Sequence, residues 1–236
     1  MGPIAWQHHS GCYGGDVTLK ALLFDMDGTL VDSDPIHIAV FIDFLAERGV
    51  TLTEAEYMAR IHGRTNLEIF GDLLPDEDPR EMDLAKEAEY RRRVGDRMEP
   101  MPGLRDLIDA ARKADLGLAV VTNGPRANLA AVLNATGLSD AFACGVTSND
   151  VTNGKPDPEP YQRALDELGV AAGEALVFED SPSGIRSGRA AGIEVIGLAT
   201  SLDADTLKRH GARFAIKDFT DPALTRHLNA LEGAFV

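Results

Sequence analysis

The feature that most constrains the fold is an alternation of short apolar runs with longer segments of helical periodicity. The apolar runs expected to form strands are 19–24, 116–121, 141–146, 174–178, 193–198 and 212–216. The segments expected to form helices after residue 100 are 102–114, 125–135, 158–169, 182–191, 203–210 and 221–231. Such alternation is typical of parallel strands joined by crossover helices. It predicts an α/β fold with a doubly wound, Rossmann-like parallel sheet.

The alternation breaks between Asp34 and about Glu99, where only amphipathic segments occur. We expect a helical insertion there, with the chain divided into a leader (1–18), an α/β core (19–32 and 99–236) and an all-helical cap domain (33–98). Hinges are expected at 31–33 and 98–102. The acidic stretch 76–89 is interpreted as a solvated helix face.

Composition excludes several classes of protein. The formal net charge of -15 argues against nucleic-acid binding, and no apolar segment approaches the roughly 20 residues that span a bilayer. The leader lacks the features of a secretory signal, so a cytoplasmic protein is expected. The two cysteines, Cys12 and Cys144, are interpreted as free thiols. A metal site of His8, His9 and Cys12 in the leader is left out of the functional interpretation.

Polar and charged residues follow the predicted strands, at the sheet edge where ligands of open parallel sheets bind. They are Asp25, Asp27, Thr122, Asn123, Lys155, Glu179 and Asp180, with Gly28 and Gly124 giving the backbone freedom to curl around a ligand. Four carboxylates beside one lysine would repel one another. A hard divalent cation relieves that repulsion, and Mg2+ takes carboxylate, water and phosphate oxygens. The sequence therefore predicts magnesium and a phosphate.

The sequence DMDG also begins like a calcium-binding EF-hand loop. That loop needs glycine at its sixth position and a bidentate glutamate at its twelfth, where Leu30 and Ile36 stand. Calcium binding of this kind is rejected. A solvated Asp-Gly turn would explain DMDG alone, but the later strand-end residues come in order and favour a site.

Four motifs together resemble those of the haloacid dehalogenase (HAD) superfamily. They are FDMDGTLVDS, VVTNG, KPDPEPY and VFEDSPSGIRSGRAAG. The resemblance is to the phosphatase and β-phosphoglucomutase-like branch, which carries a helical (C1-type) cap where this chain has its insertion. It covers the core from about 19 to 200. An acid at Asp27 is unlike the dehalogenases of the superfamily, whose halide leaving group needs no proton.

The resemblance implies a role for each matched residue. Asp25 would be the nucleophile that forms an aspartyl-phosphate, and Asp27 the general acid and then the base, with its backbone carbonyl on the metal. Thr122, with Asn123 and Gly124, would hold the phosphate, and Lys155 would neutralise it. Glu179 and Asp180 would complete the metal site with Asp25.

Three cap residues are candidate substrate contacts. His37 lies twelve residues after Asp25, as does a functional cap histidine in β-phosphoglucomutase; a solvated histidine is the other interpretation. Gly63 would open a loop from which His62, Arg64 or Asn66 could reach the site. Arg64 would either pair with a second anionic group or lie on the surface. Asn66 stands where the mutase would have a phosphate-gripping arginine, which weakens the mutase interpretation.

The leading hypothesis is a Mg-dependent phosphatase for a small phosphate monoester, a sugar phosphate or a phosphoglycolate-like compound. The alternative is a β-phosphoglucomutase-like phosphomutase. A receiver-like signalling module is disfavoured, because its acidic pair precedes the phosphorylated aspartate by a βαβ unit and it has no lid of this length. Expected partners are a small phosphorylated metabolite, with no nucleic acid and no membrane, in a monomer or weak dimer.

Overall fold

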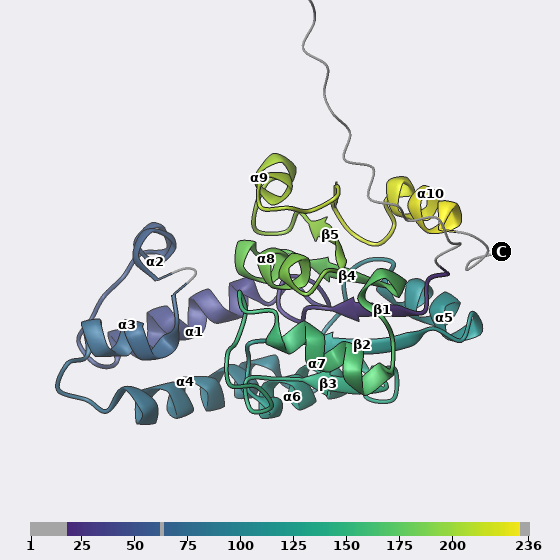
Figure 1. Ribbon diagram of the computed structural model, residues 1–236. Helices are drawn as coiled ribbons and strands as arrows, with labels where there is room; N and C mark the ends of the chain where they lie inside the picture. Colours follow the sequence, from purple (N-terminus) through teal and green to yellow (C-terminus); the bar gives the residue numbers. More distant parts are fainter. Residues whose placement is uncertain (1–17, 62–63, 232–236) are drawn as a thin grey trace, which may run out of the picture.

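A computed structural model describes residues 18–61 and 64–231, and a parallel six-stranded sheet lies at its centre (Figure 1). The strand order is β3-β2-β1-β4-β5-β6, and every neighbouring pair is parallel. The strands are β1 (Ala21–Phe24), β2 (Gly117–Val121), β3 (Cys144–Val146), β4 (Ala175–Glu179), β5 (Glu194–Leu198) and β6 (Ala215–Ile216). The predicted α/β, Rossmann-like class is confirmed.

Helices cover both faces of the sheet because successive strand residues point to opposite sides. Leu22 and Phe24 of β1 pack with α5, α6 and α10, whereas Ala21 and Leu23 pack with α7, α8 and α9. These core helices are α5 (Leu104–Lys113), α6 (Arg126–Thr136), α7 (Glu159–Leu168), α8 (Pro182–Ala190), α9 (Ala204–Arg209) and α10 (Pro222–Ala230), with a 3-10 turn η1 (Ala172–Glu174) before β4. Both faces of the strands are therefore apolar.

Two predicted strands are half as long or less in the structure as in the sequence analysis. The run 141–146 forms a strand only at Cys144–Val146, because Ala141 is part of a turn in which its N–H bonds the Leu138 carbonyl. The run 212–216 forms a strand only at Ala215–Ile216, although the Arg213 N–H still bonds the Val195 carbonyl. The predicted helices agree with the observed ones to within one or two residues at each end.

Four helices follow β1 and precede α5, and they lie to one side of the sheet in Figure 1: α1 (Asp34–Ala46), α2 (Glu54–Arg60), α3 (Asn66–Leu73) and α4 (Pro79–Val94). They enclose a hydrophobic cluster of their own, which includes Phe41, Phe44 and Phe70. Thr53 and Thr65 begin α2 and α3 with capping boxes, which satisfy the first backbone N–H groups. We call α1–α4 the cap; its division from the core at residues 33 and 98 stays a prediction.

The interpretation of 76–89 as a solvated face is wrong in part. Lys86 and Glu87 of α4 are buried, because this side of α4 lies against α1 and the core helix α6. The chain enters and leaves the cap through adjacent segments, since the Met101 N–H bonds the Leu30 carbonyl at 2.8 Å. No helix in the described part of the chain is long and apolar enough to cross a membrane.

Candidate active site

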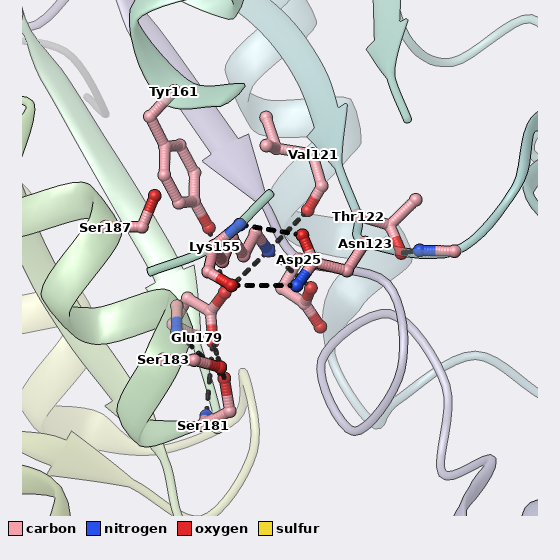
Figure 2. Close-up of polar contacts among 12 residues, drawn as sticks. Asp25, Val121, Thr122, Asn123, Lys155, Tyr161, Glu179, Ser181, Ser183 and Ser187 are labelled. Carbon is pink, nitrogen blue, oxygen red and sulfur yellow. Dashed lines mark hydrogen bonds and ion pairs between the residues drawn. The ribbon is translucent and has the colours of Figure 1, made fainter. Parts of the chain in front are cut away.

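The predicted site residues meet at the carboxyl ends of β1, β2 and β4. The chain turns in opposite directions from β1 and from β4, so a crevice opens between these neighbouring strands. Asp25 directly follows β1, Glu179 ends β4, and Lys155 reaches in from the loop after β3 (Figure 2). All three are buried. Residues far apart in the sequence are thus brought together by the strand order.

Lys155 is the cationic centre of this group. Its Nζ donates to Asp25 Oδ1 at 2.6 Å, to Glu179 Oε1 at 2.7 Å and to the Val121 carbonyl at 2.6 Å, as Figure 2 shows. Burial alone would lower the pKa of Lys155, but attraction to Asp25 and Glu179 raises it above its usual value. Lys155 therefore carries a fixed positive charge beside the Asp25 carboxylate.

Three carboxyl groups crowd around that one lysine. Single oxygens of Asp25, Glu179 and Asp180 lie within 4.8 Å of one another, close enough to ligate one cation. Burial, opposed by the attraction of Lys155 and assisted by repulsion from Glu179 and Asp27, raises the pKa of Asp25 to about 8. Burial, then repulsion from Asp25 and Glu179, also raises the pKa of Asp180 well above its usual range. This excess of buried acid, with only oxygen donors, fits a hard divalent cation.

Two glycines allow the carboxylates to come this close. A Cβ on Gly28 would lie 2.2 Å from Asp180 Oδ2, and Gly28 has a φ of +73°, which favours glycine. A Cβ on Gly184, in the first turn of α8, would lie 1.6 Å from Glu179 Oε1. Gly28 was predicted to let the backbone curl around a ligand, and the structure shows that it also leaves space for the Asp180 side chain.

The segment after β2 shapes the other side of the crevice. Thr122 is buried, and its Oγ1 accepts the Gly124 N–H at 2.9 Å, which leaves the hydroxyl proton free to donate to a ligand. The Asn123 side chain holds the Lys155 backbone: its Oδ1 accepts the Lys155 N–H at 2.8 Å, and its Nδ2 donates to the Lys155 carbonyl at 3.1 Å. The Asn123 side chain is thus a support for the lysine loop.

Asp27 faces the cap rather than the three clustered carboxyls. Its Oδ1 accepts from Ser33 Oγ at 2.6 Å and Tyr90 Oη at 3.2 Å, and lies 3.3 Å from His37 Nε2. Burial alone would raise the pKa of Asp27, but the hydrogen bonds from His37, Ser33 and Tyr90 lower it to about 2. Asp27 is therefore ionised in this arrangement.

His37 lies at the site and is not a solvated residue of α1. Its ring stacks on Tyr90 with centroids 4.1 Å apart, and its Nδ1 lies 3.2 Å from Lys86 Nζ. Because a lysine ammonium only donates, Nδ1 accepts in this contact and Nε2 carries the proton that faces Asp27. Of the two interpretations of His37, the geometry favours the functional one.

Arg64 and Asn66 do not reach the crevice. Arg64 pairs with Asp72 of α3 and also donates to the Arg60 and Glu68 carbonyls, so it belongs to the surface of the cap. Asn66 Nδ2 donates to Asp83 Oδ1 and Glu87 Oε1, both at 2.7 Å. The expectation that either side chain binds substrate is not supported by these contacts. His62 and Gly63 lie outside the described residues.

Sequence reasoning missed three residues of the site. Tyr161 donates to Glu179 Oε1 at 3.0 Å, and Tyr90 and Lys86 form the cap side of the Asp27 pocket. A signal for the last two exists in the sequence: Met82, Lys86, Tyr90 and Val94 recur every four residues and form one buried stripe of α4. A lysine within an otherwise apolar stripe is unusual, since a buried ammonium needs partners.

The sequence profile of the haloacid dehalogenase-like hydrolases matches residues 22–198. Glycerol-1-phosphate phosphohydrolase 2 of Saccharomyces cerevisiae is 32% identical over 209 residues, which cover 85% of this chain and 82% of that protein. The phosphorylated carbohydrates phosphatase of Thermotoga maritima is 32% identical over 205 residues, covering 84% of this chain and 94% of its own.

A solved structure agrees with these similarities. The HAD hydrolase of family IA, variant 3, from Entamoeba histolytica superposes with a TM-score of 0.81 at 28% sequence identity. The match covers 91% of this chain and 100% of that one, so it extends over core and cap alike.

Proposed function

The chain belongs to the haloacid dehalogenase-like hydrolase family and is a phosphoric monoester hydrolase. We propose that it cleaves a small sugar phosphate or phosphoglycolate-like ester through an aspartyl-phosphate. One observation carries the mechanism: Asp25 Oδ1 lies 2.6 Å from Nζ of the buried Lys155, next to a group of carboxyl oxygens that suits a divalent cation. This is the setting in which a carboxylate can attack phosphorus.

The first half-reaction transfers the phosphoryl group to the chain. An Asp25 carboxylate oxygen attacks phosphorus, the bond from phosphorus to the ester oxygen breaks, and its electron pair leaves with that oxygen. Asp27 donates a proton to the leaving alcohol. Because Asp27 is ionised in this arrangement, the negative charge of the arriving phosphate ester must raise its pKa enough for Asp27 to hold that proton.

The second half-reaction returns the enzyme to its starting state. Asp27, now without its proton, accepts one from water, and the water oxygen attacks phosphorus. The bond to Asp25 breaks, and the electron pair returns to its carboxylate. Lys155 and the Thr122 hydroxyl stabilise the charge on the phosphoryl oxygens in both steps.

We propose Mg2+ as the cation of the site. When bound, it supplies positive charge to the phosphoryl oxygens and to the nucleophile. Asp25, Asp180 and the Asp27 backbone carbonyl would hold it, with Glu179 fixing Lys155 and sharing the metal pocket. The raised pKa values of Asp25 and Asp180 support this proposal, because a dication favours their ionised forms.

A phosphatase is favoured over a phosphomutase by the contacts of the cap. A mutase must also grip the substrate's second phosphate, yet Asn66 is occupied by Asp83 and Glu87, and Arg64 by Asp72. The names of the two relatives, a glycerol phosphate and a carbohydrate phosphate phosphohydrolase, support a small polyol or sugar phosphate as the metabolite. A monomer or weak dimer in the cytoplasm stays a prediction.

Release of inorganic phosphate from a panel of glycerol, hexose and hexitol phosphates and phosphoglycolate tests this function. We expect turnover with MgCl2, loss with EDTA, and loss in Asp25→Asn; Asp27→Asn should retain metal binding and lose about 10²-fold or more in rate. Asp140→Asn, an exposed acid, is the matched control. Equal rates in the wild type and in Asp25→Asn would contradict the mechanism.

The phosphomutase alternative has its own test. A hexose 1-phosphate is incubated with a catalytic amount of the corresponding bisphosphate. Conversion of the isomer without stoichiometric release of phosphate would favour the mutase over the phosphatase.

A further inference from the structure

A buried polar cluster joins the cap helix α4 to the core helix α6. Glu87 of α4 accepts a hydrogen bond from Asn128 Nδ2 of α6 on its Oε2, and Arg91 Nη1 of α4 donates to Asn128 Oδ1 at 2.9 Å. Asn128 is 2% exposed and Glu87 7% exposed. The Asn128 side chain therefore contacts two successive turns of α4, donating to Glu87 and accepting from Arg91.

Glu87 is the hub of this cluster. Its Oε1 accepts from Lys86 Nζ at 2.8 Å and from Asn66 Nδ2 at 2.7 Å, while its Oε2 is left for Asn128. The first two partners belong to the cap and stay with Glu87 wherever the cap lies. Asn128 belongs to the core, so its bond forms only when α4 lies along α6. A hydrogen bond to a buried charged group is worth more than its exchange for water, so this bond favours the seating of α4 on α6.

The cluster is linked to the chemistry through adjacent residues of α4. Lys86, next to Glu87, contacts His37 Nδ1, and His37 Nε2 faces Asp27. Tyr90, one turn further along α4, donates to Asp27 directly. The position of α4 on α6 therefore decides whether the cap side of the Asp27 pocket is assembled.

We propose that Asn128 and Glu87 are positioning residues that seat α4 on α6 and so hold the cap where Tyr90 and His37 reach Asp27. Neither residue touches the phosphate pocket formed by Thr122, Lys155 and Asp25. The proposal rests on the proposed function, because the seated arrangement is the one in which the ester is cleaved.

The decisive variant is Asn128→Ala, which removes the core partner and leaves the Lys86–Glu87–Asn66 contacts in place. If seating precedes productive binding, the apparent affinity falls with the seated fraction, so KM for p-nitrophenyl phosphate rises while kcat at saturation changes less. A lost hydrogen bond to a buried charged group predicts a rise in KM of about tenfold or more. A purely structural role would lower kcat, through loss of folded enzyme, and leave KM unchanged.

Asn134→Ala is the matched control, because Asn134 is exposed on the same helix. Glu87→Gln tests the cap side of the contact and is compared with Glu81→Gln, an exposed acid on α4. We expect Glu87→Gln to raise KM and both controls to stay within twofold of the wild type. Unchanged KM in Asn128→Ala, or an equal rise in Asn134→Ala, would overturn the proposal.

Hydrogen exchange of the free protein tests the seating without any substrate. Asn128→Ala should speed exchange in peptides covering α4 and α6 but not in α9, which lies elsewhere on the core. If the wild type cleaves no ester, the proposed function fails, but the exchange rates of the wild type and Asn128→Ala still test whether the Glu87–Asn128 contact seats α4 on α6. If exchange in α4 and α6 is unchanged in Asn128→Ala, the positioning role is wrong even where the enzyme is active.

Discussion

At the scale of single residues, the position of the Glu179 side chain depends on the absence of a side chain at Gly184. Glu179 is fully buried and serves Lys155, Tyr161 and Ser181 at once, which is possible because Gly184 in α8 leaves space for its carboxylate. Gly184 has no positive φ, so its role is purely one of volume. The position of Lys155 thus depends, through Glu179, on the missing side chain of a helix residue.

Gly184→Ala should lower kcat/KM on the best ester by at least about tenfold, because a Cβ 1.6 Å from Glu179 Oε1 must displace that carboxylate and loosen Lys155. Gly173→Ala, at a glycine with nothing within 4 Å of a built Cβ, is the control. Steady-state kinetics and thermal melts measure both variants. Activity of Gly184→Ala within twofold of the control would contradict this role.

Cys144 gives a prediction of pH dependence away from the active site. Burial, then the charge and hydrogen bond of Glu167, raises the pKa of this thiol from 9.0 to about 11. The thiolate is the reactive form, so alkylation at pH 8 should be about 10²-fold slower than for a thiol of ordinary pKa. In a Cys12→Ser background the rate with iodoacetamide should keep rising up to about pH 11.

Glu167→Gln checks the cause of that shift. It removes the neighbouring charge, so it should lower the pKa and speed labelling at pH 8. A rate that levels off near pH 9 in the Cys12→Ser chain, with Glu167 in place, would mean that the Cys144 thiol is not perturbed.

At the scale of elements, the cap helices are joined by polar bonds as well as by their hydrophobic cluster. Asn66 at the start of α3 bridges Asp83 and Glu87 of α4, and capping boxes fix the starts of α2 and α3. The sequence position of Asn66 suggested a substrate contact, but its amide group instead donates to α4 and joins α3 to that helix.

Asn66→Asp should therefore destabilise the fold. The new carboxylate would replace an amide that donates to two acids, so two bonds are lost and like charges face each other. We expect a loss of about 2 kcal/mol in the free energy of unfolding. Urea titration measures it, with Asn134→Asp as the control; equal stability of the two variants would contradict the bridging role.

Much of the fold and the centre of the site could be predicted because parallel sheets obey simple rules. Apolar runs give the strands, and the residue after each run must lie at the carboxyl edge, so the sequence alone placed Asp25, Thr122 and Asp180 together. The hydrogen bond between Glu87 and Asn128 could not be predicted, because it depends on how α4 is rotated against α6. Periodicity tells which side of a helix is apolar but not which polar side chain it meets there.

At the scale of the whole molecule, repulsion among the carboxylates of the site lowers the free energy of unfolding. Asp25, Glu179 and Asp180 lie close together in a chain whose net charge is already -15, and Lys155 pairs with Asp25 and Glu179. Sites built for ligands commonly carry strain of this kind, and neutral substitutions in them raise stability while removing function. The cation that the site is proposed to bind would relieve the strain.

Asp180→Asn separates these two effects in the folded protein. Burial and repulsion from Asp25, Glu179 and Asp34 make the Asp180 charge unfavourable, so without metal the variant should be more stable than the wild type by about 1 kcal/mol. In the wild type, Mg2+ at a hundred times its Kd should stabilise the fold by about 2.7 kcal/mol, and the variant should lose most of that gain. Thermal melts with and without MgCl2 give both values, and Asp140→Asn, an exposed acid, should keep the full response. A variant that melts below the wild type without metal, yet still gains the full stabilisation with it, would show that Asp180 is neither a strained charge nor a ligand.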